Sequence, residues 1–384
     1  MEKKFELVRE FHDLEELEDY KASLESIERR EKKSRVEILG TALELKDLNG
    51  KPIEMRRFGE YQPIQISENR DYLLLQKYEE GKVLVQMRNL RGDRIWEEEV
   101  GSSYYGFISN DGNCSVFFKG YGWMMNRIVN EIEFYNGKGE KLKHVSFEGL
   151  IWALPIVFSN EAQKLVTWTK AIKVEEDGSR EIFGPARIYS FDLQGNELWN
   201  YQIKEQGIHD LKIFNDGKIT IAVGEGEGEI VEGRFQGTAH IYFINDQAKL
   251  VAEIPFDYGC NEAGIDFCEE TKKVAIFADQ NLFLLEGETG VKLWNYVDPN
   301  MLFCYIDVSS QSNEVVAGGY DKNRDFNMLL FDQEGKKIAE KMVELDDEPL
   351  SIEISDDGQY IFLELSHIGM VFSLKEKTTS TEEL

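Results

Sequence analysis

One short turn pattern occurs seven times along the chain and constrains the fold more than any other feature. In its clearest copy, LLEGETGVKLWNY at 284–296, an apolar run stops at a polar turn ending in Gly290, and Leu293 restarts the apolar alternation. Equivalent turn positions, each followed three residues later by an aliphatic residue, are Gly50, Gly92, Gly139, Gly195, Gln247 and Gly335. Because glycine adopts positive φ at little cost, each copy is typical of a β-hairpin. Gln247 departs from the pattern, and we expect mild strain there.

The spacing of these turns predicts the architecture. Consecutive turn positions lie 42 to 56 residues apart, which is typical of propeller blades or of helical repeats. The segments between them, such as GFISNDGNCSVFF and IDFCEETKKVAIF, alternate apolar and polar residues around a short polar turn, which predicts two strands each. Two such strands and the two of the hairpin make one blade, and its four strands are called a, b, c and d in chain order. We therefore predict an all-β fold, a seven-bladed β-propeller of four-stranded antiparallel blades.

The two ends of the sequence differ from this repeat. Residues 1–35 carry apolar side chains at steps of three and four, including Leu7, Phe11 and Leu14, which predicts an amphipathic helix. We expect it to pack against the propeller, with partner binding as the alternative. Residues 36–375 form the predicted propeller and 376–384 a disordered tail. The last unit holds three strands, and we expect residues 52–58 to supply its fourth and close the ring.

Composition narrows the classes of partner and compartment. The net charge is −28, so nucleic acid and anionic membrane surfaces would be repelled, whereas basic partners or cations would be attracted. No apolar run is long enough for a membrane span. The four cysteines form no CxxC pair and are typical of free thiols in a reducing compartment. We expect a cytoplasmic protein, or a secreted or periplasmic one if a signal peptide precedes this sequence.

Two strings in the repeats resemble known propeller families. GNELWNY and GVKLWNY are similar to the c–d turn of quinoprotein-like propellers with PQQ-like repeats, and the Asp–Gly turns at 111–112, 216–217 and 357–358 resemble those of WD40-type propellers. The resemblance covers about residues 45–375. It implies a propeller fold, and for several family members a non-catalytic scaffold. The vicinal cysteine pair of the quinone dehydrogenases is not present, so no catalytic residue is carried over.

Motifs for catalysis or metal binding are few. The five histidines are scattered without a metal-binding spacing, and GEGEGE at 224–229 is too acidic to bind phosphate. One string, Asp321, Asn323 and Asp325, places oxygen donors at alternate positions, as loops that bind Ca²⁺ do, but Phe326 stands where those loops need glycine. We expect a plain acidic loop there, with a Ca²⁺ site as the alternative and no other cofactor.

The strand order predicts a functional face. In an up-and-down blade the b–c and d–a connections emerge on one side, and here several b–c connections are long, whereas the a–b and c–d turns are short. Loops longer than a fold requires often carry function, and aromatic and Arg side chains are common in interfaces. The predicted binding residues on this face are Tyr61, Tyr104, Tyr105, Trp123, Trp152, His209, Tyr320 and Arg324.

The innermost strands predict a second site. Aligning the a strands places Asp266, Asp307 and Glu353 at one position in three consecutive blades. Like charges so close together disfavour joint ionisation unless water, a cation or a basic group intervenes. The hypothesis is a Ca²⁺ or other cation site, and the alternative is a hydrated channel wall.

The sequence predicts a binding or scaffolding module rather than an enzyme. We expect its long-loop face to bind a protein partner or a small ligand. The alternative is an enzyme or ligand sensor with a site at the channel mouth, possibly dependent on a cation.

Overall fold

Every regular element that the structure describes is a β-strand. The computed structural model describes residues 3–11, 35–39, 42–46, 52–57, 61–67, 71–79, 82–89, 93–100, 103–119, 128–152, 156–159, 161–170, 172–174, 180–182, 184–225, 227–231, 234–258, 263–345, 348–365 and 369–376. No helix occurs in these ranges, so none could span a membrane there. The chain divides into two compact units, one of residues 27–225 and 244–250, and one of residues 1–26, 226–243 and 251–384.

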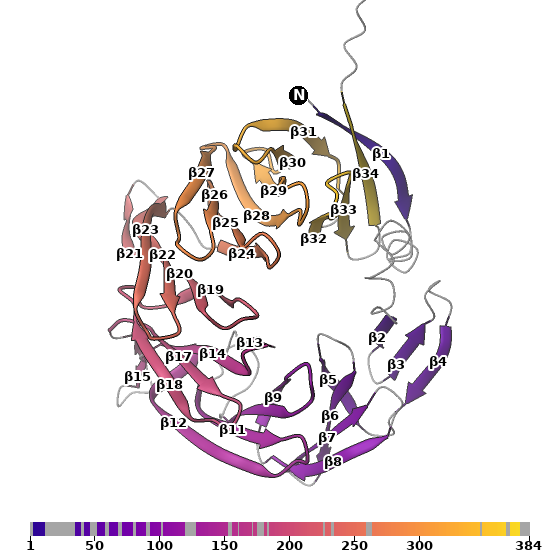
Figure 1. Cartoon of the computed structure of the whole chain (residues 1–384), viewed down its shortest axis with the longest axis vertical. Coiled ribbons are helices and arrows are strands. Elements are labelled where there is room, and N and C mark those ends of the chain that lie inside the picture. The colour runs from indigo at the N-terminus through magenta and orange to yellow at the C-terminus, as the bar shows by residue number, and fades with distance from the viewer. Residues whose placement is uncertain are drawn as a thin grey trace, which may run out of the picture. The chain divides into compact units, whose positions relative to one another are not determined.

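The first unit begins with a three-stranded antiparallel sheet and continues with three blades (Figure 1). The small sheet contains β2 (Arg35–Leu39), β3 (Ala42–Lys46) and β4 (Pro52–Arg57). Blade 1 contains β5 (Gln62–Ile66), β6 (Tyr72–Glu79), β7 (Lys82–Asn89) and β8 (Arg94–Glu99). Blade 2 contains β9 (Ser103–Ile108), β10 (Cys114–Lys119), β11 (Ile128–Asn136) and β12 (Lys141–Trp152). Blade 3 contains β13 (Val157–Ser159), β14 (Lys164–Thr169), β17 (Arg187–Asp192) and β18 (Glu197–Gln202), with the hairpin β15 (Ile172–Val174) and β16 (Arg180–Ile182) in its b–c connection.

Four further blades follow in the chain. Blade 4 contains β19 (Ile208–Ile213), β20 (Ile219–Gly224), β21 (Glu227–Val231), β22 (Arg234–Asn245) and β23 (Leu250–Tyr258). Blade 5 contains β24 (Ala263–Cys268), β25 (Lys273–Ala278), β26 (Asn281–Glu286) and β27 (Lys292–Val297). Blade 6 contains β28 (Met301–Val308), β29 (Val315–Asp321), β30 (Phe326–Phe331) and β31 (Lys337–Val343). Blade 7 contains β32 (Pro349–Ile354), β33 (Tyr360–Leu365) and β34 (Gly369–Glu376). The seven sheets of four or five strands confirm the predicted seven-bladed β-propeller.

The strand that completes blade 7 differs from the prediction. Residues 52–57 pair with β3 in the small sheet, and the outer position beside β34 is taken by β1 (Lys3–Phe11), as Figure 1 shows. These residues were expected to begin an amphipathic helix, but they form an antiparallel ladder with β34, from Lys3 opposite Glu376 to Phe11 opposite Gly369, with a register shift between Leu7 and Arg9. Burial of Phe5 against Phe372, with ring centroids 6.5 Å apart, favours the strand over the helix. The rest of the predicted helix, residues 12–34, and the predicted tail, 377–384, lie outside the described residues.

The repeated turn glycines adopt the backbone conformation that the pattern predicts. Gly139, Gly195, Gly290 and Gly335 have φ between 67° and 81°. In blade 4 the prediction was one residue out of register, because the turn position is Ala248, with φ 57°, and not Gln247. The amide of Ala248 donates to the Asn245 carbonyl at 3.0 Å, as Gly195 does to Asp192 and Gly335 does to Asp332. The Asp–Gly turns also have positive φ, at Gly112, Gly217 and Gly358.

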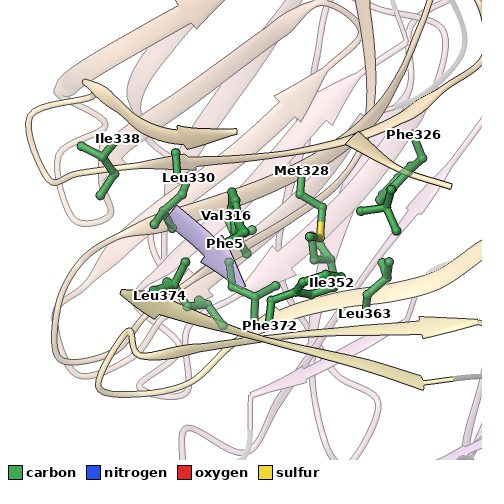
Figure 2. Packing of buried hydrophobic residues seen from close by; sticks show 14 residues of the cluster. Phe5, Val316, Phe326, Met328, Leu330, Ile338, Ile352, Leu363, Phe372 and Leu374 are labelled. Atoms are coloured by element: carbon green, nitrogen blue, oxygen red, sulfur yellow. The ribbon is translucent and has the colours of Figure 1, made fainter. Parts of the chain in front are cut away.

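Each turn glycine also permits close packing on an aromatic side chain of the preceding blade. A Cβ atom on Gly139 would lie 2.8 Å from Trp96 Cγ, and one on Gly335 would lie 2.5 Å from Trp294 Cγ. The core is built from such contacts between adjacent blades. In the cluster of Figure 2, Phe5 of β1 packs with Phe372 and Leu374 of β34 and with residues of blade 6, including Val316 and Leu330. The repeat therefore determines both the turn and the contact between blades.

Candidate functional site

The three carboxylates predicted to lie together do so in part. Asp266 is on β24, Asp307 on β28 and Glu353 on β32, which are the first strands of blades 5, 6 and 7. Asp266 and Asp307 are hydrogen-bonded to each other, whereas Glu353 is exposed and acts on Asp307 only through its charge. The alignment of the a strands therefore identified one contacting pair and one more distant member.

The same backbone interaction recurs at each of the two aspartates. The Val308 amide of blade 6 donates to Asp266 Oδ2 of blade 5 at 3.2 Å, and the Ile354 amide of blade 7 donates to Asp307 Oδ2 of blade 6 at 2.6 Å. The Val308 amide also donates to Asp307 Oδ1 at 2.9 Å. Each side chain thus joins its own blade to the next, and the repeated acid has a structural role.

Burial and the adjacent charge of Asp266 raise the pKa of Asp307 well above its ordinary value, and the Ile354 amide opposes this rise. A proton held by the pair relieves the repulsion between the two carboxylates. Within the described ranges, no group of three or more His, Cys, Asp or Glu side chains is arranged to hold a metal ion. A cation at this position stays a prediction.

The other predicted cation ligands form a turn. Asp321 Oδ1 accepts the amides of Asn323 and Asp325 at 2.8 and 2.9 Å, and Arg324 adopts φ 69°. Asp332 accepts the amides of Glu334 and Lys336 in the same way at 3.1 and 2.9 Å. The string at 321–325, in the b–c connection of blade 6, therefore has the conformation of the c–d turns, with Arg324 where blade 6 has Gly335 in its c–d turn. The turn explains the alternating Asp and Asn without a bound cation.

Two of the long b–c connections contain paired strands within the described residues. In blade 3, β15 pairs with β16 over three residues, and in blade 4, β21 pairs with the first half of β22. In blade 2, β11 and β12 continue beyond the blade, where Ile128 pairs with Trp152 and Val129 with Ile151. The sequence predicted the length of these connections but not their pairing. Part of each of these connections is thus regular backbone structure.

A partly buried ion pair joins the second strands of blades 3 and 4. Lys170 directly follows β14, and its ammonium lies 2.6 Å from Glu225 Oε2, directly after β20. Only 10% of the Lys170 side chain is exposed, and the neighbouring Glu205 is 2% exposed as a residue. Because an unpaired buried charge costs several kcal/mol, we expect this pair to hold the ends of β14 and β20 together. Sequence reasoning missed it, since no local signal distinguishes Lys170 from a surface lysine.

The structure places the predicted binding residues in different environments. Tyr61 is half-buried and donates to Glu97 Oε2 at 2.7 Å. Tyr320 packs on Phe326, with ring centroids 5.4 Å apart, and His209 is half-buried in β19. Arg324 is exposed at its turn. Tyr104, Tyr105 and Trp152 lie in β9 and β12, while Trp123 lies outside the described residues. These residues do not form one described cluster, and their binding role stays a prediction.

A groove that sequence reasoning missed lies between blades 1 and 2, on the side of the short turns. Its volume is about 380 Å³. It is lined by Tyr72, Met87, Ile95, Asp111, Gly112, Asn113, Asn136, Gly137 and Lys138. Most of its polar groups already serve the turns: Asp111 accepts from Ser109 and Asn113, and Asn136 accepts the amides of Lys138 and Glu140. The exposed Ile95 beside the double-glycine turn at 136–139 was the available signal.

Cysteine chemistry is absent from these sites as far as the structure describes them. Cys114 and Cys268 are buried, Cys304 is half-buried, and all three are free thiols. Burial raises the pKa of Cys114 to about 12, so its thiolate is scarce at neutral pH. Cys260 lies outside the described residues.

Comparison with known proteins leaves the function open. No protein-family model and no curated protein matches the sequence. Among solved structures, a chain of the mitotic checkpoint complex is similar over 79% of this chain and 84% of that chain, at 12% identity and a TM-score of 0.42. A chain of the eukaryotic initiation factor is similar over 80% of this chain and 85% of that chain, at 12% identity and a TM-score of 0.43. Likeness at this level supports no conclusion about function.

Proposed function

We propose that the b–c face of this propeller is a non-catalytic binding surface that engages a protein partner. The observation that carries the proposal is that two of the long connections on this face contain paired strands. In the described residues, β15 pairs with β16 and β21 with β22, and an ion pair joins Lys170, at the end of β14, to Glu225, at the end of β20. A preformed surface loses less conformational entropy on binding than a disordered loop does, so it favours a specific partner.

Charge indicates the kind of partner. The net charge of −28 attracts a basic protein and repels nucleic acid at long range. The steering weakens with salt, so association should slow as ionic strength rises. That the repeats are of the quinoprotein-like kind is part of the proposal and rests only on the strings GNELWNY and GVKLWNY.

The test removes one hairpin and keeps the blade. Residues 172–182 would be replaced by a short Gly–Ser linker, and far-UV circular dichroism would verify that the propeller is intact. The matched control is Lys138→Ala, which alters the groove on the opposite side. Wild type, hairpin variant and control would be used as baits, and retained proteins identified by mass spectrometry. We expect a protein that the wild type and Lys138→Ala retain and the hairpin variant loses. Identical sets from all three baits would contradict the proposal.

A further inference from the structure

The outer hairpin of blade 2 carries a dense polar network on one face. Glu131 and Glu133 alternate along β11, and their cross-strand partners on β12 are Ser146 and His144. Residues two apart on a strand share a face, and directly opposed residues do too, so these four side chains point to the same side of the sheet. Histidine, serine and two carboxylates therefore meet on a surface that the proposed binding function does not use.

The imidazole of His144 lies between a hydroxyl and a buried carboxylate. His144 Nε2 is 3.0 Å from Ser146 Oγ, and His144 Nδ1 is 3.6 Å from Glu133 Oε1. Glu131 Oε1 is 3.7 Å from the same Nε2, so Ser146 is its closer partner. The Glu133 side chain is 1% exposed, whereas 37% of the His144 side chain is exposed. Ser146 is exposed to solvent as well.

Other side chains hold the carboxylate in place. The Tyr135 hydroxyl donates to Glu133 Oε2 at 2.9 Å, and the Lys141 ammonium contacts Glu133 Oε1. Burial and the carboxylate of Glu133 raise the pKa of Tyr135, so its hydroxyl stays a donor at neutral pH. Glu133 is thus fixed on the Nδ1 side of the ring. A proton on Nδ1, directed at this carboxylate, leaves Nε2 as an acceptor for the Ser146 hydroxyl.

We propose that Ser146 is an activated nucleophile that accepts acyl groups from small activated esters. A hydroxyl next to a base that a carboxylate orients is the arrangement that acyl transfer requires. The face is open, so it admits small acyl donors and gives no pocket for a large substrate. Ser146 and His144 are the catalytic residues, and Glu133 positions His144.

Transfer of the acyl group to Ser146 requires only the ester, and the later hydrolysis requires water. Ser146 Oγ attacks the ester carbonyl carbon as its proton moves to His144 Nε2. The tetrahedral intermediate then collapses, the bond to the leaving alcohol breaks, and His144 returns the proton to that alcohol. The acyl group remains on Ser146 as an ester. Water later attacks the acyl carbon as its proton moves to His144. The bond to Ser146 Oγ then breaks and His144 returns the proton to that oxygen, which releases the carboxylic acid and restores the serine.

The first experiment follows acylation with p-nitrophenyl acetate. Nitrophenol release would be recorded by absorbance, and the acetylated residue identified by peptide mass spectrometry. Ser351 is a control within the same chain, because its hydroxyl donates to Glu364 at 3.1 Å and has no described imidazole partner. We expect acetyl on Ser146 and not on Ser351. His144→Asn should slow acetylation of Ser146 by about 100-fold, which is the lower range for general-base catalysis.

The second experiment separates positioning from structure. Glu133→Gln removes the charge but keeps the shape, and Glu133→Asp keeps the carboxylate. We expect Glu133→Gln to slow acetylation and Glu133→Asp to restore part of the rate, with circular dichroism verifying the fold of both. Equal acetylation of Ser146 and Ser351, or an unchanged rate in His144→Asn, would overturn the proposal. The polar network would then only stabilise the pairing of β11 with β12.

Discussion

The turn glycine of blade 6 allows the packing between blades to be tested quantitatively. Gly335 has φ 80°, and a Cβ atom there would lie 2.5 Å from Trp294 Cγ and 2.7 Å from Cδ2. Trp294 is 8% exposed and stacks on Phe331 at 5.6 Å, so its ring has little room to retreat. Gly335→Ala should therefore destabilise in two ways. The left-handed backbone costs about 1 to 2 kcal/mol, and the overlap with the ring costs about 1 to 3 kcal/mol more.

The chain offers a control that isolates the backbone part. Gly184 has φ 76°, and a Cβ atom there would meet nothing within 4 Å. Gly184→Ala should therefore cost only about 1 to 2 kcal/mol. In a Trp294→Ala background, which itself loses about 3 to 5 kcal/mol, Gly335→Ala should cost no more than Gly184→Ala.

The free energies of unfolding would come from urea titrations followed by far-UV circular dichroism, because a tryptophan signal would change with the substitution. The quantity of interest is the coupling between positions 294 and 335, expected at about 1 to 3 kcal/mol. A coupling near zero, or equal losses for Gly335→Ala and Gly184→Ala in the wild-type background, would refute the argument that the glycine is required for contact with the ring.

Three further outcomes are expected. Asp307 has a raised pKa, so its bound proton stabilises the fold fully below about pH 4, and this contribution is lost as pH rises through the folded pKa. Asp266→Asn should flatten this fall in urea titrations at several pH values, and an unchanged profile would refute proton sharing. Phe5→Ala should lose about 3 to 5 kcal/mol, since Phe5 is 4% exposed, and a loss below about 1 kcal/mol would mean that β1 contributes little. Because both oxygens of Asp307 accept backbone amides, Ca²⁺ and Mg²⁺ should leave the melting temperature unchanged, and a rise abolished in Asp307→Asn would instead establish a cation site.

The repeat carried most of the fold prediction, because turn chemistry and strand alternation are local properties of a sequence. Gly139, Gly195, Gly290 and Gly335 were identifiable since only glycine adopts positive φ without strain. The shift at blade 4 arose because the aliphatic spacing favoured Gln247, whereas the Asn245 side chain defines the turn by accepting the amides of Gln247 and Lys249. The position of the side-chain acceptor would have located this turn correctly.

The parts that could not be predicted depend on contacts distant in sequence. Residues 3–11 have apolar positions compatible with either a helix or a strand, and only the partner β34 decides between them. Similarly, Lys170 is an ordinary lysine until Glu225 is placed beside it, and Ser146 is an ordinary surface serine until β11 brings Glu133 against His144. For the acids of the a strands, alignment predicted the proximity of Asp266 and Asp307, but the backbone amides that they bind could not be foreseen.

The pairing of β1 with β34 has a consequence for biosynthesis. Phe11 pairs with Gly369, so the connection between them spans 369 − 11 = 358 residues. Closing so long a loop costs only about 2 to 3 kcal/mol more than closing one of about 20 residues, because the entropy grows logarithmically. The delay between the synthesis of the two strands has the larger effect. At about 5 to 20 residues per second, a ribosome adds β34 about 20 to 70 s after β1. Through that interval β1 has no partner strand, and its apolar side chains and free backbone groups are exposed to chaperones and to other nascent chains.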